Sequence, residues 1–528
     1  MKKVVIKIVI ILSIFSCGDN TNQVIEENFN LSVKSKNAME IYKQAKLKAE
    51  RGDYIGSKAD YEAALRIEPD FIMALLDINE NNIIKKKRYL DKAYNNYENA
   101  TPSEKIFIDL SKRGITRDET EILLKKLIEL NPENSEAYGR LGFFYGSRNE
   151  KKRDEFFSKA LEKNQNNLGV RREIFRNRYL SNYFAEGGMK DYNFFKFPDS
   201  VKAFENQINK LISLDSLNVS IYRDIGDRYR QSTLYLTRAR DYYLRGVEVA
   251  NLEGNSYRSE LLHTAGNASF LLDEKEIAFN YYNESLEVEF DPFLKMKRIY
   301  QLTTAYFFDQ DYVNSIATLN NFENQLKTFG FNQSEIIQAM VSIYWYKSQI
   351  YAMMGNSNES FKSWEIFEQN SQELLKEVND IGELIRDRNR KFGNVASGLN
   401  DRIARAETLI RERDFIELNI LNNNLNKAKS LIKISNQSDE NKKTFSFLIS
   451  CINNNFKEAT EFLKLDFEPL NNREINRFLI RFHYGNLLLR NGKIDEGKKI
   501  LTDISDIRGF GFVVGYVKKE SKKILSNL

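Results

Sequence analysis

Apolar residues recur along most of the chain at intervals of three and four, which is the spacing of one face of an α-helix. Gly, Asn or Pro interrupts these stretches, so the pattern predicts pairs of helices joined by tight turns. A unit of about 34 residues repeats, and such a period is typical of stacked helix pairs. Its clearest copies span residues 37–69, 135–167, 259–290 and 476–506. We therefore predict an all-α fold built as a solenoid.

The first copy carries small, aromatic and turn-forming residues at fixed positions: Ala45, Gly52, Tyr54, Tyr61, Ala64, Leu65 and Pro69. Small side chains let two helices approach closely, aromatic rings fill the gap to the next pair, and proline stops the second helix. This arrangement resembles the tetratricopeptide repeat family. The resemblance covers most of the chain and implies a tetratricopeptide-repeat α-solenoid, which is a right-handed superhelix of helix-turn-helix pairs.

Changes in the pattern divide the chain into six ranges. Gly187 and Gly188, followed by the aromatic stretch 192–198, interrupt the periodicity and predict a loop or insertion. The six predicted ranges are a signal peptide at 1–16, a flexible tether at 17–36, an N-terminal array at 37–185, the loop at 186–200, a central array at 201–370 and a C-terminal helical array with a capping helix at 371–528. Longer helices are predicted after Gln369 from the spacing of Leu374, Val378, Ile381 and Ile385.

The N-terminus has the pattern of an export signal. Three lysines accompany an apolar stretch that ends at Phe15, and small residues surround Cys17. The segment 12–17 resembles the lipoprotein box of bacterial lipoproteins, in the loose form common in Bacteroidetes. That resemblance implies cleavage before Cys17, acylation of Cys17 with chains such as palmitate, and a lipid anchor in the bacterial cell envelope, with the outer membrane preferred over the inner one. An ordinary cleaved secretory signal and a buried N-terminal helix are the alternatives.

Charge and cysteine content exclude several classes of protein. Loss of the three N-terminal lysines would lower the formal net charge from +5 to +2, and both signs are interspersed along the chain. This balance gives no basic patch of the kind that binds nucleic acid. Of the two cysteines, only Cys451 would remain free after acylation of Cys17, so no intramolecular disulfide is expected. Cys451 follows an apolar helix pattern, which predicts a buried side chain.

No motif predicts a catalytic or metal site. The only two histidines, His263 and His483, lie far apart and neither is near a cysteine. Gly509, Gly511 and Gly515 form a spaced run that lacks the Lys-Ser/Thr ending of a phosphate-binding loop, and we interpret it as close helix packing or a loop. We therefore predict a protein that is not an enzyme and that uses no cofactor and no metal.

The concave groove is the predicted interaction site, because known tetratricopeptide modules bind peptides there. The family's inward-facing offsets point to a mixed polar and aromatic wall: Arg223, Asp227, Arg230, His263, Asn267, Tyr300, Thr304, Trp345 and Gln349. Ordinary surface or packing roles are the alternative for each position. The lysine and asparagine set that captures chaperone C-termini is not reproduced.

These features favour an adaptor lipoprotein that holds a protein partner of unknown identity, in an envelope secretion, assembly or motility complex. The membrane would be contacted through the lipid anchor alone. A SusD-like carbohydrate-binding lipoprotein is the second hypothesis, although the chain has only two tryptophans, Trp345 and Trp364, and few long loops. A regulator of a peptidoglycan enzyme is a third.

Overall fold

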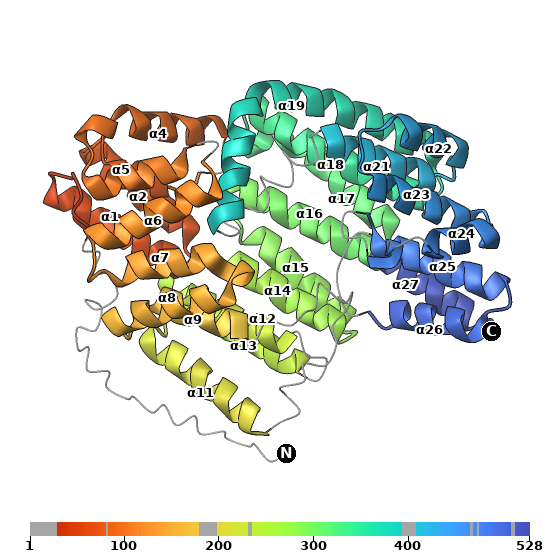
Figure 1. Cartoon of the computed structure of the whole chain (residues 1–528), viewed down its shortest axis with the longest axis horizontal. Helices are drawn as coiled ribbons and strands as arrows, with labels where there is room; N and C mark the ends of the chain where they lie inside the picture. The colour runs from red at the N-terminus through yellow and green to blue at the C-terminus, as the bar shows by residue number, and fades with distance from the viewer. Residues whose placement is uncertain are drawn as a thin grey trace, which may run out of the picture.

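The structure is a computed structural model that describes residues 29–80, 83–112, 115–178, 198–230, 235–392, 408–464, 468–471, 475–507 and 513–528. Every regular element within these ranges is a helix (Figure 1). Successive helices pack in antiparallel pairs, and the predicted all-α solenoid of helix-turn-helix units is confirmed. The four clearest sequence copies each correspond to one pair.

The N-terminal repeats are joined by short turns, and each pair consists of a first and a second helix. Their helices are α1 (Lys36–Glu50), α2 (Tyr54–Ile67), α3 (Ile72–Asp77), α4 (Ile83–Asn95), η2 (Tyr97–Asn99), α5 (Pro102–Ser111), α6 (Arg117–Leu130), α7 (Ser135–Tyr145), η3 (Gly146–Arg148), α8 (Glu150–Lys163) and α9 (Leu168–Arg178).

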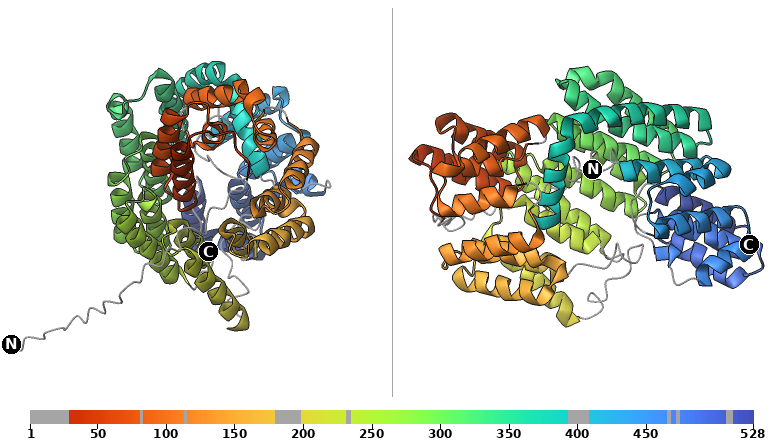
Figure 2. Two further views of the ribbon diagram at one scale, coloured as in Figure 1. Left: turned by 90° about the vertical axis from the view of Figure 1, so that its left-hand side faces the viewer. Right: turned by 45° about the horizontal axis from the view of Figure 1, so that its top comes forward.

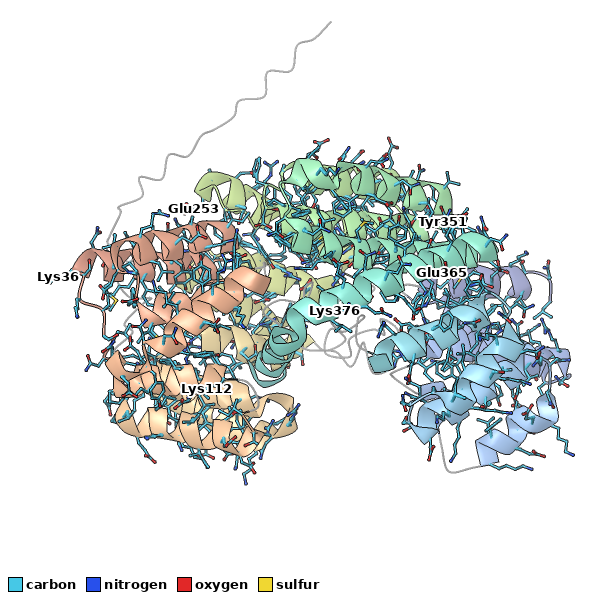
Figure 3. All side chains as sticks on the ribbon, turned by 90° about the horizontal axis from the view of Figure 1, so that it is seen from above. Lys36, Lys112, Glu253, Tyr351, Glu365 and Lys376 are labelled. Carbon is cyan, nitrogen blue, oxygen red and sulfur yellow. The ribbon has the colours of Figure 1, made fainter. Side chains whose placement is uncertain are left out.

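The central repeats follow the same order and end in the longest helix described. Their helices are α11 (Pro198–Leu214), α12 (Val219–Arg230), α13 (Leu236–Glu253), α14 (Arg258–Leu271), α15 (Lys275–Glu287), α16 (Pro292–Phe308), α17 (Tyr312–Gln325), η5 (Leu326–Phe329), α18 (Gln333–Met353) and α19 (Ser357–Phe392). Seen from above, α19 runs past Lys376 toward the N-terminal repeats (Figure 3).

The C-terminal repeats form a third group with its own apolar core. Their helices are α21 (Thr408–Leu421), α22 (Leu425–Ile434), α23 (Asp439–Ile452), α24 (Phe456–Lys464), η6 (Pro469–Asn471), α25 (Arg477–Arg490), α26 (Ile494–Ser505) and α27 (Val514–Leu525). Cys451 is buried in this core, as predicted. The proposed division into six ranges remains a prediction.

Local sequence explains where the helices begin. The Asp53 carboxylate accepts a hydrogen bond of 3.1 Å from the Gly56 N–H at the start of α2. Capping boxes start α5 at Thr101 and α18 at Asn332, each with a glutamate three residues later. Gly52, in the turn between α1 and α2, has φ of 88°, a left-handed conformation that glycine adopts without a steric penalty.

Small residues set the distance between paired helices. Glycines in the first helices α7, α12 and α14 face aromatic rings of the second helices. A Cβ atom at Gly142, Gly226 or Gly266 would lie 2.4–2.5 Å from the ring of Phe157, Tyr243 or Tyr282, respectively. The glycine therefore admits the aromatic side chain, which fills the space between the two helices.

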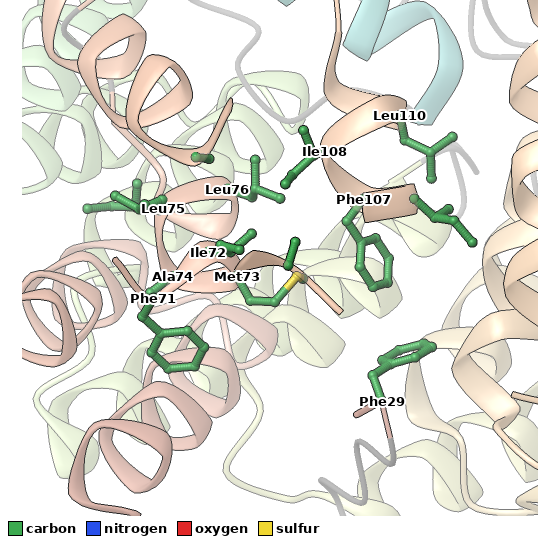
Figure 4. Close-up of a cluster of buried hydrophobic side chains, with 14 of the residues drawn as sticks. Phe29, Phe71, Ile72, Met73, Ala74, Leu75, Leu76, Phe107, Ile108 and Leu110 are labelled. Atoms are coloured by element: carbon green, nitrogen blue, oxygen red, sulfur yellow. The ribbon is translucent and has the colours of Figure 1, made fainter. Parts of the chain in front are cut away.

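Apolar side chains from neighbouring helix pairs pack together and form the core between repeats. Phe71 and Ile72 at the start of α3 belong to the same buried cluster as Phe107 of α5 (Figure 4). The ring of Phe29 packs edge-on against Phe107, with 5.2 Å between the ring centroids. This cluster extends as far as Tyr145, so the first four repeats share one continuous core.

The solenoid curls around a common axis, so its first repeat returns to contact the central repeats (Figure 2). The Arg51 guanidinium makes two hydrogen bonds of 3.0 Å to the Asp215 carboxylate, between α11 and α12. The ring of Tyr54 packs against Tyr257, between α13 and α14, with 6.0 Å between centroids. These contacts, which we call the closure contacts, join the first repeat to the central repeats.

Candidate functional site

Charged side chains on the first helices, together with one histidine, are linked from repeat to repeat by ion pairs and hydrogen bonds. We call this strip the inner wall, and it comprises Lys46 and Glu50 of α1, Glu136 and Arg140 of α7, Arg172 and Arg176 of α9, Arg223, Asp224, Asp227 and Arg230 of α12, Glu260 and His263 of α14, and Lys297 and Arg298 of α16. Only side chains on the concave side of a curved array reach repeats beyond their neighbours, and several of these do so.

Two ion pairs show that these side chains face one another across the coil. Lys46 of the first repeat lies 3.5 Å from Glu136 of the fourth. Arg172 of α9 donates to the Glu50 carbonyl at 3.4 Å and pairs with Asp224 of α12 at 2.8 Å. The chain of contacts thus runs from the first repeat through the fourth and fifth to the sixth.

The central part of the inner wall surrounds Glu260. Its carboxylate is contacted by Arg298 at 2.6 Å, by Lys297 at 3.0 Å and by Arg223 at 3.3 Å. Burial alone would raise the pKa of Glu260, but the three cations hold this pKa well below its usual range. Glu260 is therefore an anion that anchors cations from α12 and α16.

Arg298 is fixed more firmly than its neighbours. Its side chain is 3 % exposed, and its Nε donates to the Ser259 Oγ at 2.7 Å. Its Nη1 donates to the Gln301 Oε1 at 2.6 Å. A guanidinium with its donors used in this way orients the cluster and is less able to turn toward a ligand.

Other inner-wall side chains keep part of their surface in solvent. The side chains of Arg223, Glu136 and Arg140 are 35 %, 31 % and 28 % exposed, respectively. The surrounding protein nevertheless desolvates the Glu50 carboxyl and raises its pKa to about 7. Charges that are solvent-accessible and also enclosed by protein on several sides provide strong, directional contacts for a polar ligand.

Four of the residues predicted from sequence meet in this cluster. Arg223 donates to the Tyr257 hydroxyl, and Asp227 lies 3.6 Å from both Arg223 and Arg230. The His263 ring packs against Tyr282, with 5.1 Å between centroids. Burial, with the charge of Arg298 next in importance, lowers the pKa of His263 well below its usual range, so its imidazole is neutral.

Asn267 lies one turn further along α14. Its side-chain oxygen accepts a hydrogen bond of 2.9 Å from the Tyr282 hydroxyl, so it holds the α14–α15 pair together. Thr304 of α16 is partly exposed and donates to the Tyr300 carbonyl within its own helix at 2.8 Å. Neither contact excludes a ligand, but both give these side chains a structural role.

The remaining predicted residues join the repeats that follow. The Tyr300 hydroxyl donates to the Ala339 carbonyl of α18 at 3.0 Å, and its ring stacks on Tyr346. Trp345 Nε1 donates to Asp414 of α21 at 2.9 Å. Gln349 is buried, with 4 % of its surface exposed.

The sequence reasoning missed several members of the inner wall. The missed residues are Lys46, Glu50, Glu136, Arg140, Arg172, Arg176, Asp224, Glu260, Lys297 and Arg298. The recurrence of a charged residue in one first helix after another is the signal that could have found them. Contacts between distant repeats, such as Lys46 with Glu136, have no sequence signal.

A second recess lies where the C-terminal cap meets the central repeats. It is a cleft of about 930 Å³ lined by the turn residue Asp273, by Phe308 and by three lysines of α27, Lys518, Lys519 and Lys522. A Cβ atom at Gly515 would lie 2.3 Å from the Phe308 carbonyl oxygen, so this glycine permits close helix packing, as predicted. Gly509, Gly511, Gly187 and Gly188 lie outside the described residues, as does Cys17.

The described residues contain no group of three or more His, Cys, Asp or Glu side chains arranged to hold a metal ion. Within the same ranges, no helix has both the length and the apolar character needed to cross a membrane.

No protein-family model matches the chain, and no curated protein sequence matches it. Solved structures that align with it include a TPR domain. Yeast Tom70 aligns at 13 % identity over 93 % of this chain and 95 % of its own, with a TM-score of 0.30. The TPR domain of P58(IPK) aligns at 12 % identity over 76 % of this chain and 100 % of its own, with a TM-score of 0.17.

A third structure, Naa15/Naa10 bound to HypK-THB, aligns at 10 % identity over 93 % of this chain and 80 % of the matched chain, with a TM-score of 0.18. With such scores, the fold assignment rests on this chain's own helix pairs.

Proposed function

We propose that the protein is an adaptor whose inner wall holds an extended or helical segment of a partner protein. The observation that carries this proposal is the strip of enclosed but solvent-accessible charges that links α1, α7, α9, α12 and α14. The strip displays cations and anions side by side, which suits a polypeptide with both charges and backbone polar groups. Alternating acids disfavour a nucleic-acid phosphate backbone.

We further propose that the adaptor is a lipoprotein of the bacterial envelope, lipidated at Cys17. The support is the sequence of the N-terminal segment alone. Two or more acyl chains make a stable anchor, whereas one chain binds marginally. Cys17→Ser should remove incorporation of radiolabelled palmitate and shift the protein from the membrane fraction to the soluble fraction. Unchanged labelling or unchanged fractionation would contradict the anchor.

The carbohydrate-binding alternative gains no support from the two tryptophans. Trp364 is buried, with 2 % of its surface exposed, and stacks on Phe415. Trp345 is held by Asp414. A sugar-binding platform needs an open aromatic face, so neither indole favours this function.

The adaptor proposal can be tested by crosslinked purification of the tagged protein from cells that make it. Arg223→Ala with Arg230→Ala removes two cations from the inner wall. Lys429→Ala with Lys433→Ala removes two exposed cations from α22 and is the matched control. We expect one or more proteins to be captured by the wild type and the control, and to be lost from the inner-wall variant. Equal capture by all three would contradict the proposal.

A further inference from the structure

The first helices of the central repeats carry an excess of cations. α9, α12, α14 and α16 together contain eleven Lys and Arg residues but only four Asp and Glu residues. The helices that follow them in the described chain, α11, α13, α15 and α17, contain six Lys and Arg residues and nine Asp and Glu residues. The surplus of positive charge therefore belongs to the helices that carry the inner wall, and not to the central repeats as a whole.

Burial separates the two signs of charge on these four helices. The side chains of their acids are 7–28 % exposed, and the acids are Glu260, Asp224, Asp227 and Glu173. Four cations are 31–48 % exposed, and we call them the cationic face: Arg230, Lys297, Arg223 and Arg176. Solvent therefore meets more cation than anion on this part of the inner wall.

The most buried acids hold the cations in place. The Asp224 carboxylate is contacted by Arg172 at 2.8 Å and by Arg176 at 3.6 Å. Glu260 is contacted by three cations, two of which, Arg223 and Lys297, belong to the cationic face. A carboxylate that is buried and already paired attracts a further base only weakly, whereas the partly exposed cations can attract an acid from solvent.

We propose that the inner wall recognises an acidic segment of the partner polypeptide, whose Asp or Glu side chains contact the cationic face. This inference rests on the proposed adaptor function and names the chemistry of its partner. The carboxylates are those of side chains, so the segment can lie within the partner chain as well as at its end.

The arrangement of charge favours an acidic polypeptide over a nucleic acid. Asp227 and Glu173 reach the surface between the cations, with 22 % and 28 % of their side chains exposed. A phosphate backbone has a negative charge at every nucleotide and would also meet these two acids. A polypeptide can place neutral residues opposite them and carboxylates opposite the cations.

A synthetic peptide tests this preference without knowledge of the partner. The probe is a fluorescent, acetylated and amidated peptide in which glutamate alternates with serine, and anisotropy with the full-length protein at low salt is the measurement. Matched peptides carry lysine or glutamine in place of glutamate. We expect the wild type to bind the glutamate peptide at least about tenfold more tightly than either matched peptide. This affinity should fall as salt is added, because exposed charges are screened.

Arg176→Gln with Lys297→Gln removes two members of the cationic face and leaves the buried acids paired. Asp224 keeps Arg172 as a partner, and Glu260 keeps the buried Arg298. The affinity for the glutamate peptide should therefore fall at least about fivefold while the melting temperature stays close to that of the wild type.

A control and a charge reversal complete the set of variants. Lys429→Gln with Lys433→Gln removes two exposed cations from α22 and should leave the affinity for the glutamate peptide unchanged. Arg176→Glu with Lys297→Glu should bind the lysine peptide more tightly than the wild type does. Such a gain cannot arise from loss of folding.

Three results would overturn the proposal. The first is equal affinity of the wild type for the glutamate and glutamine peptides. The second is equal affinity of the folded inner-wall variant and the α22 control for the glutamate peptide. The third is an oligothymidylate that competes as strongly as the glutamate peptide, because phosphate would then be recognised as well as carboxylate.

This test is separate from that of the adaptor function. If the inner wall captures a protein whose binding the glutamate peptide does not compete, the acidic segment is refuted and the adaptor function stands. If the glutamate peptide binds as expected but no protein is captured from cells, the preference of the cationic face stands and the adaptor function is refuted.

Discussion

Helices α14 and α25 occupy the same place in two repeats, one in the central array and one near the C-terminus, but they bury different chemistry. Both have glycine at the ninth residue, Gly266 and Gly485. The third residue is Glu260 in α14 and Leu479 in α25, and both are buried. The sixth is His263 in α14 and Phe482 in α25, and both are again buried.

One helical framework thus carries two kinds of buried side chain. The shared glycine keeps the two helices of each pair close. The third and sixth residues differ: they are polar or charged in α14 and apolar in α25. Around α14 they form the ion network of the inner wall. Around α25 they join an apolar core with α23 and α26. The central repeats thus bury charged side chains that the proposed adaptor function uses, whereas the C-terminal repeats bury an apolar core.

The largest expected effect comes from removing a buried cation of the network. Arg298→Ala should lower the free energy of unfolding by about 3 kcal/mol, because Glu260 loses its closest partner while remaining buried. Arg481→Ala, which removes a pair with the half-exposed Asp503 in the C-terminal array, should cost less than about 1 kcal/mol. Chemical denaturation measures both, and equal losses would contradict the comparison.

The shared glycines should also differ in their tolerance of a methyl group. At Gly266 a Cβ would lie 2.5 Å from the Tyr282 ring, so Gly266→Ala should destabilise by about 1–3 kcal/mol. At Gly485 the nearest atom is a Leu501 methyl at 3.0 Å, and alanine gains about 1 kcal/mol of helix propensity. Gly485→Ala should therefore be close to neutral in thermal denaturation. A larger loss of stability for Gly485→Ala than for Gly266→Ala would contradict this expectation. It would show that the Tyr282 ring moves away from an added methyl group more easily than the Leu501 side chain does.

The closure contacts belong to the first coil of the solenoid and give a third test. Arg51→Ala removes two hydrogen bonds to the buried Asp215 and should cost about 2 kcal/mol. It should also raise the radius of gyration in small-angle scattering, because the first repeat is released from the central ones. Arg66→Ala, at an exposed position of α2, is the control and should change neither quantity. An unchanged radius for Arg51→Ala would mean that the remaining closure contacts suffice.

The smallest expected effect is on pH dependence, where the two regions should behave alike. Desolvation raises the pKa of Glu50 in α1 to about 7, and burial and the nearby Asp414 raise that of Glu417 in α21 to about 7. A carboxyl with a raised folded-state pKa contributes stability below its ordinary pKa of about 4.5, and that contribution is lost as the pH rises through about 7.

The melting temperature of the wild type should therefore contain a component that falls between pH 5 and pH 8. Glu50→Gln and Glu417→Gln should each reduce this component, and melts at the two pH values measure it. A reduction for Glu417→Gln alone would show that Glu50 is fully solvated on the inner wall.

The sequence predicts the helix pairs well because their determinants are local. Gly52 with a positive φ, the buried Ala45 and the buried Tyr61 all lie within one repeat. The proximity of Arg223, Asp227 and Arg230 is predictable for the same reason, since they follow one another on α12, whereas their role in a groove stays a prediction. Tyr300 and Trp345 were assigned to the groove by offset alone, whereas their hydrogen bonds reach Ala339 and Asp414 in other helices.

Contacts between distant repeats could not be predicted from these patterns. The pairing of Arg51 with Asp215 depends on how far the solenoid curls, which is the sum of many small rotations between repeats. The apolar spacing in the distal half of α19 predicts a helix with one apolar face, but it is compatible with packing against any neighbour.

Site-specific photo-crosslinking can show directly whether a partner segment lies on the inner wall. A benzophenone amino acid would be placed at Lys297, on the inner wall, and separately at Asn283, an exposed position of the neighbouring helix α15. We expect a partner adduct from position 297 and none from position 283. An adduct from position 283 with none from position 297 would contradict it.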